Sequence, residues 1–166
     1  MTELADVPSF KTVRHVPFTA DEMFALVADV ETYPQFVPLC ESLVVRSREG
    51  EPPGSLIVAT MGIGYKAIRE SFTTRVELDS AGRKILVTHV DGPFRKLENR
   101  WGFRPRADGA SCDVDFAIDY EFRSPILAVL MGAVFDTAFR KFSDAFEERA
   151  GVVYGRRRPV AGPVSG

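Results

Sequence analysis

Residues 112–150 read CDVDFAIDYEFRSPILAVLMGAVFDTAFRKFSDAFEERA, and this stretch predicts the fold. In its first part, apolar residues alternate with residues that are almost all charged. The apolar positions are Cys112, Val114, Phe116, Ile118, Tyr120 and Phe122, and the positions between them are Asp113, Asp115, Ala117, Asp119, Glu121 and Arg123. This period of two is typical of an antiparallel strand with one face in water. At about 3.3 Å per residue the strand spans about 40 Å.

The second part, from Ser124 to about Ala150, predicts a long helix. Ser124 is a good N-cap because its hydroxyl can accept from a free first-turn N–H, and Pro125 suits the first helical position. Gly151 follows, where a left-handed stop is easiest without a Cβ. About 26 residues give roughly 39 Å of helix. A one-faced sheet followed directly by a helix of equal length implies that the sheet bends around the helix.

The two halves of this helix differ. The second half carries an apolar stripe with charged residues on the other faces; the stripe is Phe135, Phe139, Phe142 and Phe146. The first half, Pro125–Phe135, contains no charged residue. A helix that is apolar all round must be covered all round, by protein, ligand or lipid.

The rest of the chain predicts more strands and two short helices. A first strand is expected over residues 10–18, and Thr19 with Glu22 forms a capping box that starts a short helix. Residues 29–40 carry Pro34 and Pro38, so they predict a helical turn with an extended exit. Further strands are expected at residues 42–48, 55–61, 65–78, 83–90 and 97–104. We expect one α+β domain over residues 1–153 and a disordered tail over 154–166, which has no apolar period.

Composition excludes several classes of function. A net charge of −2 with scattered arginines gives no electrostatic case for DNA binding. Cys40 and Cys112, with no signal-like start, indicate core thiols in a reducing, cytoplasmic protein. No uncharged run approaches the roughly 20 residues of a membrane span. Contact with a membrane is therefore expected only from outside, as a transient peripheral contact.

Familiar catalytic and metal-binding motifs are absent from the sequence. The two histidines, His15 and His89, lie in different predicted strands without the spacing of a metal site, and His89 is interpreted as a structural or surface side chain. There is no nucleophile elbow and no glycine-rich phosphate loop. We therefore predict no catalytic residues, no metal and no catalytic cofactor.

Polar residues on apolar faces are more informative. If Phe72 faces inward, Lys66, Glu70 and Thr74 share its face by the period of two, and Asn99 lies among inward apolar neighbours. An inward carboxylate must be paired, hydrated or protonated. One interpretation leaves Glu70 at the rim, beside Lys66 or an arginine. The other makes Glu70 and Asn99 the polar end of a cavity.

The thirteen phenylalanines are the second sign of a cavity. Core packing explains many of them, but a concave sheet closed imperfectly by one helix would leave an apolar pocket. The ligand-binding candidates are Phe36, Lys66, Glu70, Phe72, Phe94, Asn99, Trp101, Phe116, Tyr120, Leu127, Met131, Val134 and Phe135. Pro125–Phe135 and the loop Asp91–Phe94 are expected to form the portal and to face the membrane.

The order of elements resembles the helix-grip fold of the START-like and polyketide-cyclase superfamily, and three stretches are similar to its coenzyme-Q-binding branch. They are YPQFVPLC at 33–40, DGPF at 91–94 with LEN at 97–99 and WGF at 101–103, and VDF at 114–116 with YEFRS at 120–124. The resemblance implies a curved antiparallel sheet wrapped around a long C-terminal helix. It also implies non-catalytic binding of ubiquinone or a polyprenyl precursor, as a chaperone or carrier that supports respiratory electron transport.

The same branch includes proteins described as ribosome-association toxins, so regulation of translation on the ribosome remains an alternative. A cyclase-type enzyme on this fold is a second alternative, and Glu70 is then the only plausible acid or base in the cavity. For a bound quinone, Asn99, Tyr120 or Lys66 could donate hydrogen bonds to the head, whereas Glu70 could do so only when protonated.

Overall fold

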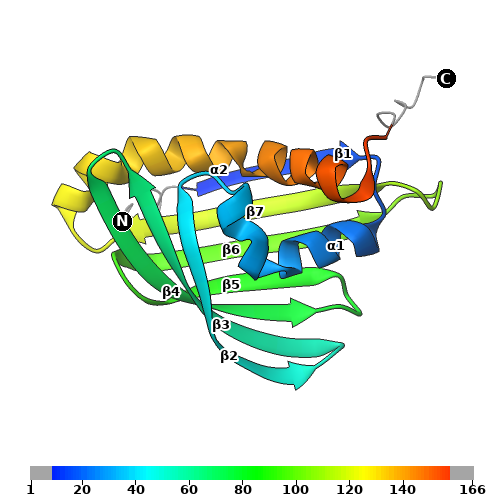
Figure 1. Cartoon of the computed structure of the whole chain (residues 1–166), viewed down its shortest axis with the longest axis horizontal. Coiled ribbons are helices and arrows are strands. Elements are labelled where there is room, and N and C mark those ends of the chain that lie inside the picture. Colours follow the sequence, from blue (N-terminus) through cyan, green and yellow to red (C-terminus); the bar gives the residue numbers. More distant parts are fainter. Residues whose placement is uncertain (1–8, 158–166) are drawn as a thin grey trace, which may run out of the picture.

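The computed structural model describes residues 9–157, which form one curved sheet, two short helical segments and one long helix (Figure 1). The elements are β1 (Ser9–Val16), α1 (Ala20–Ala28), the three-ten helix η2 (Val30–Gln35), β2 (Cys40–Glu51), β3 (Gly54–Tyr65), β4 (Ile68–Asp79), β5 (Lys84–Asp91), β6 (Phe94–Pro105), β7 (Cys112–Phe122) and α2 (Pro125–Tyr154). The α+β fold class and the two short helices after the first strand are confirmed.

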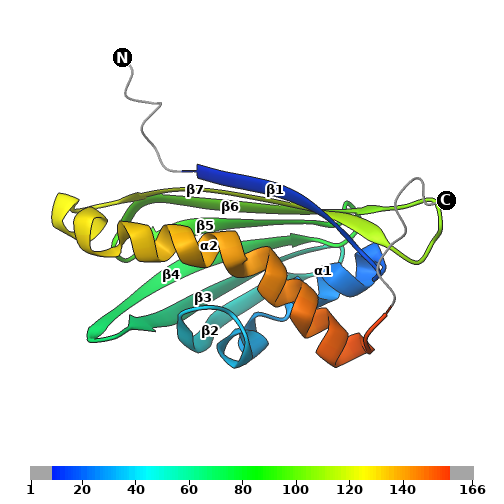
Figure 2. The same ribbon diagram turned by 90° about the horizontal axis from the view of Figure 1, so that it is seen from above.

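The sheet is antiparallel throughout, with the strand order β1-β7-β6-β5-β4-β3-β2. Strands β2 to β7 form a meander of consecutive hairpins, and β1 pairs with β7 at one edge. The sheet curls from one edge to the other, so that α2 lies within its concave side (Figure 2). This is the arrangement that the strand and helix of equal length predict.

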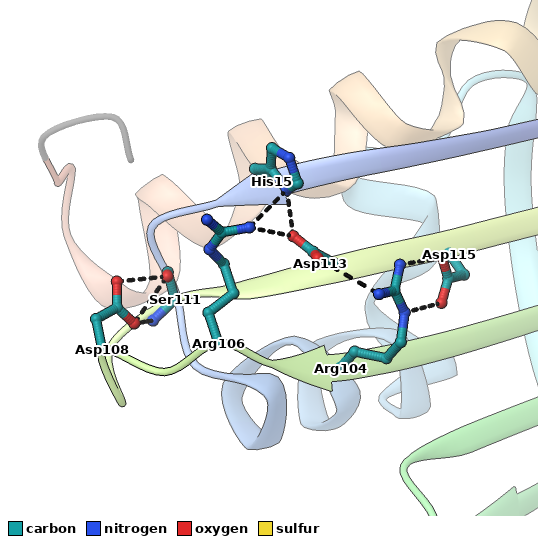
Figure 3. Close-up of polar contacts among 7 residues, drawn as sticks. All are labelled: His15, Arg104, Arg106, Asp108, Ser111, Asp113 and Asp115. Atoms are coloured by element: carbon teal, nitrogen blue, oxygen red, sulfur yellow. Dashed lines mark hydrogen bonds and ion pairs between the residues drawn. The ribbon is translucent and has the colours of Figure 1, made fainter. Parts of the chain in front are cut away.

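Strand β7 follows the predicted alternation along its whole length. Its six apolar side chains are buried, from Cys112 to Phe122, and the residues between them are only partly buried. On the outer face, the carboxylates of β7 meet basic side chains of the neighbouring strands. Arg104 on β6 binds Asp115 through two hydrogen bonds of 2.7 and 2.8 Å, and Asp113 accepts from Arg106 and from His15 on β1 (Figure 3). These contacts tie β1, β7 and β6 together.

Helix α2 begins as predicted and packs by the predicted stripe. The Ser124 hydroxyl accepts from the backbone N–H groups of Ile126 and Leu127, at 3.1 and 3.4 Å. Three ring pairs join the stripe to β7, with centroid distances of 5.3 Å for Phe122–Phe135, 5.0 Å for Tyr120–Phe139 and 6.0 Å for Phe116–Phe142. The stripe therefore faces the sheet. Phe142 is only half-buried, however, whereas Phe135, Phe139 and Phe146 are buried.

The predicted helix stop at Gly151 is wrong. The helix continues to Tyr154, and Gly155, with φ of 92°, ends it. The extra turn is anchored because the Tyr154 hydroxyl donates to the Glu22 carbonyl oxygen at 2.9 Å and its ring contacts Phe18. Residues 155–157 continue along the surface, and the remainder of the tail that was expected to be disordered, 158–166, lies outside the described residues.

Other predictions were correct in kind but not in their limits. The Thr19–Glu22 capping box is present at the start of α1. Strands β3 and β4 are separated only by a tight turn at Lys66 and Ala67, so the strand that was predicted from residue 65 begins at Ile68. Strand β6 begins at Phe94, three residues earlier than expected, because a backbone irregularity after Phe94 lets the strand continue into the β5–β6 turn.

The long helix lies off-centre within the sheet. It approaches β7, β1 and α1 most closely and stays farther from the inner faces of β3, β4 and β5. Large side chains must fill the wider space on that side, and any space that they leave becomes a cavity. Among residues 9–157, no helix is long and apolar enough to cross a membrane.

Candidate functional site

A cavity of about 90 Å³ lies between the middle of α2 and the inner faces of β3 to β6. It is enclosed by side chains from η2, from the loop after η2, from the six strands β2 to β7 and from α2. Its lining residues are Val30, Tyr33, Pro38, Leu39, Leu43, Ala59, Met61, Ile63, Phe72, Thr74, Val76, Val87, Leu97, Asn99, Trp101, Ile118, Phe135, Ala138, Phe139, Phe142 and Phe146. None of these side chains is charged, so the space is an apolar slot.

The cavity owes its polar character chiefly to Asn99. Its Oδ1 accepts from the Trp101 indole N–H at 2.9 Å, and its Nδ2 donates to the Ala117 carbonyl oxygen at 2.9 Å. An amide nitrogen carries two hydrogens, so one N–H of Asn99 remains for a ligand. The Thr74 hydroxyl and the Tyr33 hydroxyl, which donates to the Val27 carbonyl oxygen at 2.5 Å, also belong to the lining.

Strand register explains why these residues meet. Val87 on β5 lies opposite Asn99 on β6, which in turn lies opposite Ile118 on β7. Val76 on β4 lies opposite Val87. The four side chains therefore form a row across the inner face, and Asn99 is the one polar member of that row.

Of the predicted ligand-binding residues, four line the cavity: Phe72, Asn99, Trp101 and Phe135. Phe116 and Tyr120 are buried in the aromatic core beside it and contact Trp101 and Phe139. Met131 is buried nearer the start of α2, and Leu127 and Val134 are half-buried there. Phe36, the residue after η2, packs on Phe146. These latter six residues do not reach the cavity.

Lys66 and Glu70 lie away from the cavity. The expectation that Lys66 faces inward is wrong, because it sits in the β3–β4 turn with φ of 55° and is exposed. The side chain of Glu70 keeps the inward parity of the strand, but Glu70 lies near the start of β4 and is half-exposed. This placement agrees with the rim interpretation of Glu70, although the neighbouring Arg69 pairs with Glu41 instead.

Phe94 closes the cavity at the end where α2 begins. It is almost fully buried, and its ring contacts Phe72 and Phe135, both of which line the cavity, at 5.3 and 5.6 Å between centroids. The His89 ring meets Phe94 edge-on at 5.7 Å, and its buried Nε2 has no hydrogen-bond partner among the described residues. Burial, together with the nearby Arg123, lowers the pKa of His89, so this imidazole is neutral at pH 7. His89 is therefore an inner structural side chain.

Sequence reasoning missed most of the lining from η2, β2 and β3. Tyr33, Pro38 and Leu39 belong to the YPQFVPLC stretch, from which only Phe36 was selected, and Phe36 packs on Phe146 without lining the cavity. Leu43 and Met61 come from short strands with weak alternation. The two prolines were the available signal, because they bend this segment back over the open side of the sheet.

The lining offers apolar contacts and a few hydrogen-bonding groups. It carries no carboxylate, imidazole, amine or thiol. The described residues contain no group of three or more His, Cys, Asp or Glu side chains placed to hold a metal. Cys40 and Cys112 are buried free thiols, and burial raises the pKa of Cys40 to about 11 and that of Cys112 to about 12, so neither is a ready nucleophile.

The size of the cavity limits what can enter it without rearrangement. Ligand pockets commonly measure about 300–1,000 Å³, so a space of about 90 Å³ is smaller than most of them. Leu43, Met61 and Phe142 are only half-buried, and they mark the side on which the cavity approaches solvent. A ligand larger than a few water molecules requires these side chains, or the ring of Phe94, to move.

Comparisons with solved structures show the same fold. The chain aligns with an aromatase/cyclase, Zhui from Streptomyces sp. R1128, with a TM-score of 0.73 and 18% identity, over 87% of this chain and 93% of the other. The solution structure of an 18 kDa protein from Caulobacter crescentus aligns with a TM-score of 0.71 and 34% identity, over 90% of this chain and 99% of that one. The fold is thus shared with enzymes and does not by itself decide whether this chain catalyses a reaction.

Two kinds of curated relative match most of the chain. The ribosome association toxin RatA of Escherichia coli K12 is 36% identical over 91% of this chain and 92% of its own length. The mitochondrial coenzyme Q-binding protein COQ10 homolog B of Xenopus laevis is 30% identical over 87% of this chain and 59% of its own length. The family model described as "Polyketide cyclase / dehydrase and lipid transport" matches residues 16–147. The chain therefore belongs to the polyketide cyclase / dehydrase and lipid transport family, and its relatives include ribosome association toxins and a coenzyme Q-binding protein.

Proposed function

We propose that the protein binds a membrane-derived isoprenoid lipid, ubiquinone or a polyprenyl precursor, and carries it in support of respiratory electron transport without transforming it. The observation that carries this proposal is the cavity, whose lining is apolar except for a few hydrogen-bonding groups and contains no charged side chain. The relative named for coenzyme Q binding supports the choice of a quinone.

The cavity suits the two parts of such a ligand. An isoprenoid tail gains about 25 cal/mol for each Å² of apolar surface removed from water, and it needs only a dry slot. A quinone head carries carbonyl and methoxy oxygens, which accept hydrogen bonds but do not donate them. The remaining Asn99 N–H and the Thr74 hydroxyl can donate to these oxygens.

A carrier function agrees better with the lining than an enzymatic one does. General acid–base catalysis needs a titratable group within hydrogen-bond reach of the substrate. The Tyr33 hydroxyl is committed to the Val27 carbonyl oxygen, and burial raises its pKa further above neutrality. Glu70, the carboxylate proposed for a cyclase, lies at the rim and outside the lining.

Trp101 provides a direct test because it is the one tryptophan of the chain and it lines the cavity. A quinone bound against the indole should quench its fluorescence. We expect saturable quenching when a short-chain ubiquinone analogue is titrated into the protein in mild detergent. Val87→Phe should weaken the apparent affinity by roughly tenfold, because it fills the space beside Asn99.

Val44→Phe is the matched control, because Val44 is an exposed valine on β2 outside the cavity. It should bind the analogue as the wild type does. Circular dichroism must show that both variants are folded. Equal quenching in the wild type and in a folded Val87→Phe variant, or quenching that does not saturate, would refute binding in this cavity.

A second candidate function is regulation of translation on the ribosome, and the RatA-named relatives favour it. Most arginines of this chain are paired with carboxylates, among them Arg14, Arg83 and Arg104, and the net charge of −2 gives no overall attraction to ribosomal RNA. Sucrose-gradient sedimentation with purified ribosomes is the test. Salt-sensitive co-migration with a subunit would support this function, and absence from all ribosomal fractions would exclude it.

A further inference from the structure

Exposed apolar side chains gather where α2 begins. Ile126, Val129 and Leu130 are 69%, 83% and 57% exposed. Residues 125–135 include no charged side chain that would hydrate this surface. Scattered single apolar residues need no explanation, but three adjacent ones on the first turns of a helix mark a surface that meets a partner. We call Ile126, Val129 and Leu130 the apolar face.

Basic side chains border this apolar face. The backbone N–H of Arg123 donates to the Pro93 carbonyl oxygen at 2.7 Å, and the Arg95 guanidinium donates to the Arg123 carbonyl oxygen at 3.5 Å. Arg95 and Arg123 therefore lie beside the Ser124 cap of α2. Lys96 follows Arg95 on β6, and the exposed Lys66 lies on the β3–β4 turn at the same end of the molecule (Figure 1).

Three of these four cations have no ion-pair partner among the described residues. Arg95 lies 3.6 Å from Glu121. Lys66, Lys96 and Arg123 have no carboxylate within 4 Å among the described residues. With Arg69, which pairs with Glu41, five cations at this end face the four carboxylates of Glu41, Glu70, Asp91 and Glu121, in a chain whose net charge is −2. The end that carries the apolar face is thus locally positive, and we call Lys66, Arg95, Lys96 and Arg123 the basic rim.

We propose that the apolar face and the basic rim together form a docking surface for a bilayer that contains anionic phospholipids. Apolar side chains can enter the acyl boundary while lysine and arginine meet lipid phosphates, an arrangement typical of reversible interfacial binding. This proposal deepens the proposed function by stating where a membrane lipid would be exchanged. Phe94 closes the cavity at this end. It is the first residue after the β5–β6 turn, and its ring contacts the cavity residues Phe72 and Phe135.

Other partners fit this surface less well. A symmetric dimer through the apolar face would bring one basic rim against its copy, because a two-fold interface joins the same patch of both subunits. Nucleic acid would satisfy the basic rim but offers little to Ile126, Val129 and Leu130. The combination of apolar centre and cationic border is matched by an anionic membrane surface.

Liposome co-sedimentation of the full chain tests the proposal, with vesicles of phosphatidylcholine alone and of phosphatidylcholine with phosphatidylglycerol. We expect binding to the anionic vesicles that falls as salt is raised. Val129→Glu should abolish it, and Arg95→Gln with Arg123→Gln should reduce it on the order of 25-fold, at roughly fivefold for each cation. The vesicles carry no quinone, so docking is measured independently of the cavity.

Two controls match these variants. Val152→Glu changes an exposed valine near the far end of the same helix, and Arg75→Gln with Lys84→Gln removes two exposed cations outside the basic rim. Both should bind vesicles as the wild type does. Unchanged binding by a folded Val129→Glu variant, or equal binding to neutral and anionic vesicles, would overturn the proposal. So would sedimentation velocity showing a wild-type dimer that Val129→Glu dissociates, since the face would then be a subunit interface.

Discussion

Asn99 joins the structure of the cavity to its proposed chemistry. It accepts from Trp101, donates to the Ala117 carbonyl oxygen and keeps one N–H for a ligand. Asn99→Leu keeps a similar volume but leaves the buried indole N–H of Trp101 without its partner. We expect a loss of about 1–3 kcal/mol in unfolding free energy, measured by urea denaturation. A loss below about 0.5 kcal/mol would show that water or a rearranged neighbour replaces the amide.

Asp113 should make the stability of the protein depend on pH. Burial works to raise its pKa, but hydrogen bonds from His15 and Arg106 prevail and hold the pKa below its usual value (Figure 3). A depressed carboxyl pKa contributes stability above the unfolded value of about 3.9, and this contribution is lost as pH falls through the folded value.

Asp113→Asn should therefore cost about 1 kcal/mol of unfolding free energy at pH 7, because solvent partly screens the ion pairs of Asp113. The difference from wild type should stay constant down to about pH 5 and shrink below about pH 4. Urea denaturation across this range measures it. Asp119→Asn on the same strand, whose carboxylate lies 3.9 Å from Arg100, should have a smaller effect. A difference that grows toward acid pH would contradict this account of Asp113.

Single residues were predictable where strand parity held. Asn99 and Trp101 were placed correctly because β6 alternates without interruption through them. Lys66 was misplaced because parity applies only within a strand, and the β3–β4 turn falls at that residue. The environment of His89 was not predictable, since it depends on Phe94 and Arg123 from other elements.

At the scale of the element, α2 combines a packing surface with a cavity wall. Phe146 is 2% exposed and contacts Trp101, Tyr33 and Phe36, whereas Phe142 is half-buried and lines the open side of the cavity. Phe146→Ala should cost about 3–5 kcal/mol in unfolding free energy, because its site is enclosed.

Phe142→Ala on the same helix should cost less, about 1–2 kcal/mol, because its partly exposed ring loses fewer contacts. Urea denaturation of the two variants measures the difference directly. Equal costs would mean that α2 lies deeper in the sheet than the structure places it.

The main elements could be read from the sequence because β7 and α2 carry uninterrupted periods of two and of about 3.6. The end of α2 could not, because Gly151 reads as a stop when its neighbours are ignored. The hydrogen bond from Tyr154 to the Glu22 carbonyl oxygen supplies the stabilisation of the last turn, and Glu22 lies on α1, far away in the sequence.

At the scale of the whole molecule, the cavity results from the off-centre position of α2. The helix stays near β7, β1 and α1, so side chains from η2, β2 and β3 close the opposite side. No local pattern reports that Leu39 and Met61 meet Phe142 across this space. The existence of an apolar pocket could therefore be predicted from the aromatic content and curved sheet, but most of its lining could not.

Extraction of the purified protein tests whether this cavity holds an isoprenoid lipid. Protein produced in a quinone-making host should be extracted with organic solvent, and the extract analysed by mass spectrometry for quinones and polyprenyl lipids. We expect such a lipid at a substantial fraction of one molecule per chain in the wild type and in Val44→Phe, and its loss in a folded Val87→Phe variant. Equal amounts in all three proteins, or no enrichment over an unrelated protein from the same host, would contradict this expectation.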